Sequence, residues 1–186
     1  VAPGPVAGID PVLAPDLSDA GAFIAAALVT GGRITIANWP QSTDQAGNAW
    51  LDLVPAFGGT VERAGTDVTF IGPSTLIGIT RDLHEVGELT PVIAAIAAHA
   101  STESVLTGIA HLRGHETDRL AALTREINSL GGSVTELEDG LRIEPAPLRG
   151  GTFHTYDDHR MAHAGAVLGL TTPDVLVENI ATTAKT

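Results

Sequence analysis

The sequence contains no cysteine, which excludes disulfides, thiolate zinc sites and cysteine nucleophiles. Aromatic residues make up only 4%, so a core must consist mainly of Ala, Leu, Ile and Val. The apolar runs at residues 23–29 and 94–100 are far shorter than the roughly 18 residues of a membrane span. The first residues also lack the basic start and apolar stretch of a signal peptide. We therefore expect a cytoplasmic protein without a membrane partner.

Positive charge is scarce as well. Ten Lys and Arg residues stand against 22 Asp and Glu residues, which gives a formal net charge of −12. This balance argues against nucleic acid as a partner. Lys185 is the only lysine, so few side chains could bind an anionic ligand, and the positions of the arginines become informative. The 186 residues, 44% of them hydrophobic, suffice for a compact domain with its own core.

The clearest feature that is present is an internal repeat. Residues 15–32 begin with Asp16 and Ser18 and continue into an Ala-rich apolar segment. Glu88 and Thr90 begin a similar segment, 72 residues after Asp16. A carboxylate and a hydroxyl before an apolar run are typical of a helix start, which predicts a helix in each copy with Ser18 or Thr90 as its cap.

Each copy ends in a pair of glycines followed by a strand, a turn and a second strand. The glycine pair at residues 58–59 recurs at residues 131–132. The last strands share an alternation of apolar residues, formed by Val68 and Phe70 in the first copy and by Leu141 and Ile143 in the second. Middle strands are expected at residues 31–38 and 104–112. The stripe of apolar residues within 117–130 predicts the clearest helix, which Gly131 ends.

A third copy begins at residues 157–170 and continues into a strand at 174–180. We therefore predict repeats at about residues 16–73, 88–146 and 158–186, the third incomplete, within a single globular domain over residues 1–186. Because a repeat of about 70 residues is too long for a solenoid unit, a duplicated α/β unit packed about a local axis is favoured. Both ends of the sequence suggest a piece of a longer protein.

Two arginines stand at predicted helix starts. Arg119 follows a possible N-cap at Thr117, and Arg160 follows a possible cap at Asp157 or Asp158. A cation in the first turn opposes the helix dipole, unless an anion binds at the same helix start. One interpretation is therefore a shared anionic ligand. The other is a pair of solvated surface arginines, with Arg119 paired to a neighbouring carboxylate, Glu116 or Asp118.

The same region allows other chemistry. His159 and His163 are four residues apart on the predicted helix, with His154 nearby, a spacing found in zinc sites. A metal-dependent hydrolase is therefore an alternative. Glu88 and Glu116 are candidate acid and base groups, although a carboxylate at a helix start is ordinarily a dipole-favourable charge.

Three motifs, HETDRLAAL at 115–123, YDDHRMA at 156–162 and the terminal TAKT, occur in that order. Together they resemble the KETDRL, Y(N/D)DHRMA and TAKT motifs of the 3-phosphoshikimate 1-carboxyvinyltransferase, or EPSP synthase, family. The segment PDLSDAGAFIAAALVTGG is similar to a helix segment of the same family, and the resemblance extends from about residue 10 to the end.

The resemblance implies an α/β (α+β) fold in which βαβαββ units pack around a local pseudo-threefold axis, one domain of the inside-out barrel of enolpyruvyl transferases. It makes this chain the C-terminal half of a two-domain enzyme whose N-terminal domain is missing. A monomer without cofactor or metal is expected. The implied reaction transfers the enolpyruvyl group of phosphoenolpyruvate to the 5-hydroxyl of shikimate 3-phosphate and releases phosphate, a step of aromatic amino-acid biosynthesis.

The resemblance also implies roles for single residues. Glu88 falls on the base that accepts the hydroxyl proton, and Glu116 on the acid that protonates the methylene carbon of phosphoenolpyruvate. The phosphoenolpyruvate-binding residues would be Arg119, Arg160 and Lys185. The residues that bind shikimate 3-phosphate would be Glu88, His111 and His115.

The chain departs from the family pattern at two of these positions, since His115 replaces a common Lys and His111 a common Asn. An enolpyruvyl transferase acting on UDP-N-acetylglucosamine remains an alternative with the same architecture. Because half of the substrate clamp would be absent, the isolated chain is expected to have little or no activity.

Overall fold

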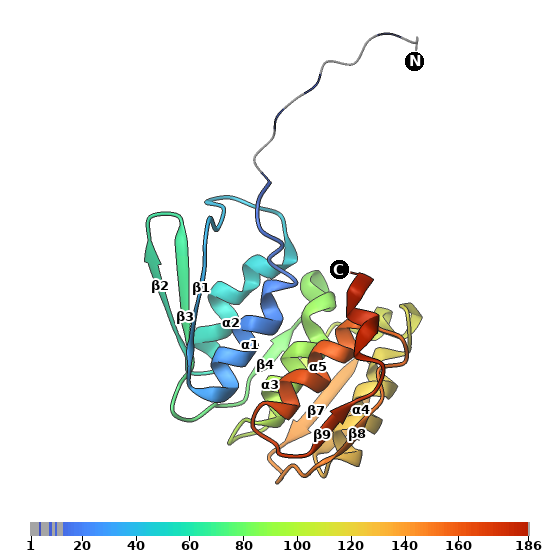
Figure 1. Ribbon diagram of the computed structural model, residues 1–186. Helices are drawn as coiled ribbons and strands as arrows, with labels where there is room; N and C mark the ends of the chain where they lie inside the picture. Colours follow the sequence, from blue (N-terminus) through green and yellow to red (C-terminus); the bar gives the residue numbers. More distant parts are fainter. Residues whose placement is uncertain (1–3, 5–7, 9, 11–12, 186) are drawn as a thin grey trace.

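The computed structural model describes residues 4, 8, 10 and 13–185. It is a mixed α/β arrangement in which three helices, α1, α3 and α5, lie side by side between small sheets (Figure 1). The α-helices are α1 (Ala20–Thr30), α2 (Trp50–Ala56), α3 (Thr90–Ala98), α4 (Arg119–Ser129) and α5 (His159–Gly169). The 3₁₀ helices are η1 (Ala46–Ala49), η2 (His84–Leu89), η3 (Ala110–Gly114) and η4 (Ile180–Lys185). Among the described residues, none of the helices is both long and apolar enough to cross a bilayer.

In the part of the chain that the structure describes, the strands form three separate sheets. They are β1 (Arg33–Ile36), β2 (Thr60–Ala64), β3 (Asp67–Ile71), β4 (Thr80–Asp82), β5 (Ser104–Thr107), β6 (Ser133–Leu137), β7 (Gly140–Glu144), β8 (Gly151–Phe153) and β9 (Val175–Val177). Their orders are β1-β3-β2, β4-β5-β7-β6 and β8-β9. Strands β4 and β5 are parallel, as are β8 and β9, whereas β2-β3 and β6-β7 are antiparallel hairpins.

The order of elements recurs along the chain. The series α1, β1, α2, β2, β3 returns as α3, β5, α4, β6, β7, and β8, α5, β9 repeats β4, α3, β5. The hairpins also share a register, because Val61 faces Phe70 in the first and Val134 faces Ile143 in the second. The predicted mixed α/β class built from repeated units is confirmed, and within the described residues the three sheets form no closed barrel.

The core lies where the three central helices meet the inner faces of the sheets. Every residue of α3 is buried, and α3 packs against both α1 and α5. The alternation predicted for the last strands is confirmed, since the side chains of Val68, Phe70, Leu141 and Ile143 are all buried. Many of the buried residues are Ala, and such short side chains let helices approach closely.

The helix ends differ in detail from the sequence predictions. Asp118, not Thr117, is the N-cap of α4, and its carboxylate accepts a hydrogen bond from the N–H of Ala121. Neither Ser18 nor Thr90 caps its helix, because the N-cap residues there are Asp19 and Leu89. Gly131 does end the helical segment, with φ of +87°, a conformation that glycine adopts without steric cost.

Candidate functional site

The N-terminal ends of the three central helices meet at one cavity. Its lining includes Ser18 just before α1, Glu88 just before α3 and Arg160 in the first turn of α5, and its volume is about 410 Å³. Unpaired N–H groups and the positive ends of helix dipoles make such a place favourable for anions. The repeat therefore has a functional consequence, because equivalent positions of successive units face the same space.

Glu88 presents a carboxylate to this cavity. The hydroxyl of Ser18 donates a hydrogen bond to Glu88 Oε1, while Glu88 Oε2 lies 3.7 Å from Nη2 of Arg160. The Glu88 side chain is 39% exposed, and that of Arg160 is 15% exposed. A proton acceptor and a guanidinium thus stand next to each other where a small anionic ligand can reach both.

Arg119 is buried, and its partner is neither Glu116 nor Asp118. Its Nε donates to Asp158 Oδ2 at 2.7 Å and its Nη2 donates to Asp158 Oδ1 at 3.1 Å, so the pair is bidentate. The interpretation of Arg119 as a solvated surface arginine paired with Glu116 or Asp118 is therefore wrong. The remaining nitrogen, Nη1, lies 3.4 Å from Nδ1 of His115, which places this edge of the guanidinium toward η3.

Asp158 connects the two arginines. It is the N-cap of α5 and accepts the N–H of Arg160 at 2.9 Å while both of its oxygens bind Arg119. Burial alone would raise the pKa of the Asp158 carboxyl, but hydrogen bonds and the charge of Arg119 outweigh burial and lower that pKa. The carboxylate is consequently ionised and fixes the start of α5 relative to α4.

The turn that delivers Asp158 is strained. Tyr156 and Asp157 both have φ of +56°, a region that costs energy for residues other than glycine. Neighbouring elements hold the turn, because the Tyr156 hydroxyl donates to Glu126 at 2.6 Å and the side-chain amide of Asn179 donates to Asp157 at 2.6 Å. Because these two hydrogen bonds hold the strained turn, they also fix the position at which α5 starts.

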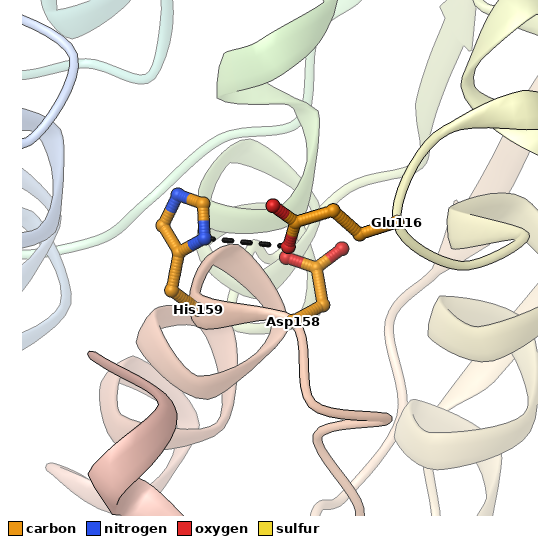
Figure 2. A group of neighbouring side chains, drawn as sticks. All are labelled: Glu116, Asp158 and His159. Atoms are coloured by element: carbon orange, nitrogen blue, oxygen red, sulfur yellow. Dashed lines mark ion pairs between the residues drawn. The ribbon is translucent and has the colours of Figure 1, made fainter. Parts of the chain in front are cut away.

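Glu116, Asp158 and His159 form a compact group (Figure 2). Nδ1 of His159 lies 3.4 Å from Oε2 of Glu116, and one ligand atom from each of the three residues falls within 4.8 Å of the others. Both oxygens of Asp158 already bind Arg119, whose charge would repel a cation. The group is therefore better suited to ion pairing and proton transfer than to holding a metal.

The three-histidine set considered as a metal site is not formed. His154 pairs with Glu178 at 2.7 Å, and the rings of His159 and His163 meet edge to face with centroids 6.1 Å apart. Of the residues described, the group with metal-ligand spacing contains His159 but neither of the other two histidines.

A row of three imidazoles lies along η2 and η3. The ring centroids of His84 and His111 are 5.4 Å apart, and those of His111 and His115 are 5.7 Å apart. Desolvation, followed by the positive charges of Arg119 and His111, lowers the pKa of His115. His115 is therefore mainly neutral at pH 7. The sequence named His111 and His115 but not His84.

Lys185 is the last described residue of η4, and its side chain lies outside the described part of the chain. Helix η4 itself packs against α5. Sequence reasoning also missed Gln45, which lines the cavity, and took Ser18 only for a helix cap. Gln45 lies in a segment without apolar periodicity, so no sequence signal marks it.

Comparisons with known proteins identify the family and the fold of this chain. The family model described as EPSP synthase (3-phosphoshikimate 1-carboxyvinyltransferase) matches residues 2–186. A curated 3-phosphoshikimate 1-carboxyvinyltransferase of Kocuria rhizophila is 59% identical over all 186 residues, which span 42% of that relative. An EPSP synthase structure from Acinetobacter baumannii superposes with a TM-score of 0.79 at 27% identity, covering 92% of this chain and 43% of that one.

The enolpyruvyl transferase NikO from Streptomyces tendae has the same fold, with a TM-score of 0.70 at 22% identity over 93% of this chain and 40% of that one. The chain thus spans less than half the length of the relatives it matches.

Proposed function

Because this chain belongs to the EPSP synthase family, we propose that it is part of an enzyme that transfers the enolpyruvyl group of phosphoenolpyruvate to the 5-hydroxyl of shikimate 3-phosphate, releasing phosphate. One observation carries the proposal. A carboxylate, Glu88, and a guanidinium, Arg160, face each other at 3.7 Å in a cavity where three helices begin. Both substrates are anions, and this cavity combines anion binding with a proton acceptor.

Phosphoenolpyruvate would bind between the two arginines, with Lys185 as a third cation. Arg160 offers an accessible fork for a carboxylate or phosphate. Arg119 has two nitrogens bound to Asp158 and offers its Nη1 edge to the ligand. On the other side, the phosphate of shikimate 3-phosphate would contact His111 and His115, with Glu88 near the reacting hydroxyl.

The chemistry is addition followed by elimination. Glu88 takes the proton of the 5-hydroxyl while the hydroxyl oxygen forms a bond to C2 of phosphoenolpyruvate. Glu116 gives a proton to C3, so that a tetrahedral intermediate forms. Phosphate then leaves C2 with the proton that Glu88 holds, and C3 returns a proton to Glu116, which restores the double bond. His159, 3.4 Å from Glu116, is placed to balance the charge of this carboxyl as its proton moves.

The same proposal covers the organisation of the protein. Residues 1–186 form one domain with repeats at about 16–73, 88–146 and 158–186, and a second domain supplies the other wall of the site. The expected enzyme is a cytoplasmic monomer. Domain closure would exclude water and strengthen the contacts of both arginines.

A joined protein tests the function. The chain is joined to the part of the Kocuria rhizophila relative that it does not match, with the two parts in the order that they have in that relative. Phosphate release by this joined protein is measured with both substrates. We expect turnover that requires shikimate 3-phosphate, and little or none from the chain alone. Turnover with UDP-N-acetylglucosamine in place of shikimate 3-phosphate would contradict the proposal, and so would near-normal turnover by the chain alone.

His115→Lys is expected to tighten binding of shikimate 3-phosphate to the joined protein by about fivefold at pH 8, equivalent to ~1 kcal/mol at an exposed site. A neutral imidazole gives way to a permanent cation there. As the pH falls toward 5.5, His115 begins to take up a proton, later than a free imidazole because its pKa is lowered, and the advantage of the variant should shrink. Isothermal titration calorimetry at both pH values measures this change.

The matched control is His154→Lys, since His154 is an exposed histidine paired with Glu178 outside the three-imidazole row. It should leave the affinity unchanged at both pH values. Equal gains from the two variants would show that net charge, and not the position of His115, determines binding.

A further inference from the structure

We propose that Ser18, held in place by Gln45, is a positioning residue for Glu88; the inference rests on the proposed function. The Ser18 hydroxyl donates to one oxygen of Glu88, and Arg160 Nη2 lies 3.7 Å from the other. The two carboxylate oxygens therefore have different surroundings. Oε1 accepts a hydrogen bond from Ser18, whereas Oε2 lies beside Arg160, another residue that lines the cavity, and is left to accept a proton.

The Ser18 hydroxyl is not used by its own helix. Helix α1 has Asp19 as its N-cap, with no side-chain cap bond. A hydroxyl just before a helix ordinarily binds an N–H of the first turn. Here it instead crosses to Glu88, 70 residues away, and so connects the first repeat to the second.

The backbone around Ser18 is fixed from two sides. The side-chain amide of Gln45 accepts the N–H of Leu17 at 2.9 Å and donates to the carbonyl of Pro15 at 3.1 Å. The carboxylate of Asp16 accepts the N–H of Ser18 at 2.9 Å. Gly47 lies so close that a Cβ there would come within 2.2 Å of the Leu17 carbonyl. This anchoring fixes the backbone position from which the Ser18 hydroxyl reaches Glu88.

Such a support matters because a glutamate side chain has several rotatable bonds and much rotamer freedom. Glu88 is 39% exposed, so packing alone does not hold its carboxylate. A general base must lie within hydrogen-bond reach of the proton it takes, and small misplacements are costly. Ser18 removes the rotamers that turn the acceptor oxygen away from the cavity.

The first test uses the chain itself, labelled with ¹³C, and follows the chemical shift of the Glu88 side-chain carboxyl carbon at pH 7. Ser18→Ala should move this signal, and Ser18→Thr, which keeps the hydroxyl, should leave it near its original position. The control is Ser133→Ala, because Ser133 donates to Glu144 at 3.4 Å in an exposed pair of the same kind. An unmoved Glu88 signal in Ser18→Ala overturns the proposal.

The second test uses the joined protein. Ser18→Ala should lower kcat about tenfold, the loss expected for one hydrogen bond to a charged group, and change KM for phosphoenolpyruvate less than twofold. Ser18→Thr should restore most of kcat. In a Glu88→Gln background, Ser18→Ala should have no further effect, because its role depends on the carboxylate. If Ser18→Ala lowers kcat in the Glu88→Gln background as much as it does in the unmodified joined protein, Ser18 is not a positioning residue for Glu88.

The two tests separate the proposals. If the Glu88 signal responds to Ser18→Ala but the joined protein shows no enolpyruvyl transfer, the coupling of Ser18 to Glu88 stands and the proposed function fails. If transfer occurs and Ser18→Ala changes only the melting temperature, the function stands and Ser18 is structural.

Discussion

Replacing Glu88 with Gln is expected to lower kcat of the joined protein by about a hundredfold to ten-thousandfold, the usual contribution of a general base. The amide has the size of the carboxylate and can still accept the hydrogen bond of Ser18, so the site keeps its shape. It cannot accept the proton of the attacking hydroxyl. KM for phosphoenolpyruvate should change little, because Arg160 and Arg119 keep their positions.

The control for this variant is Glu103→Gln. Glu103 pairs with Arg142 at 3.7 Å, the same separation as Glu88 and Arg160, but both partners are about half exposed. This change should leave kcat within twofold of the unmodified protein. If Glu88→Gln retains more than a third of kcat, the proton acceptor is another group.

Local patterns predicted the elements that the chain builds from neighbouring residues. The alternation in β3 and β7 and the apolar stripe of α4 each follow from residues a few positions apart, and Gly131 marks the helix end directly. Strands β4 and β8 were not evident as patterns. Each strand has only three residues, too few for an apolar alternation to stand out. In β4, moreover, all three residues are exposed.

In the candidate site, too, the sequence predicted single residues but not the contacts between distant ones. The motifs brought Glu116, Asp158 and Arg160 to attention because each lies within a few residues of a predicted helix start. The pairings could not be predicted, since Arg119 meets Asp158 across 39 residues and Ser18 meets Glu88 across 70. Such contacts depend on how the repeats pack, which the spacing of residues in one unit does not encode.

Breaking the buried pair of Arg119 and Asp158 by removing one partner should destabilise the chain far more than breaking an exposed ion pair. Side-chain exposure is 4% for Arg119 and 0% for Asp158. Asp158→Asn leaves a buried guanidinium without a counter-charge, which typically costs ~3–5 kcal/mol of unfolding free energy. Urea denaturation of the chain at pH 7 measures the loss.

The pH dependence of this loss has a defined sign. The pKa of Asp158 is lowered in the folded chain, so its stabilisation is fully present above the unfolded-state pKa of about 3.9 and is lost as the pH falls through the folded value. The difference between the original chain and Asp158→Asn should therefore persist at pH 5 and shrink only in stronger acid.

Two comparisons make the Asp158 result specific. Glu103→Gln breaks an exposed pair and should cost at most ~1 kcal/mol. The double variant Arg119→Met with Asp158→Asn removes the uncompensated charge and should be more stable than Asp158→Asn alone, because the penalty comes from the stranded guanidinium and not from the absent pair. If the double variant is the less stable of the two, packing of the Arg119 side chain, and not charge, holds the start of α5 against α4.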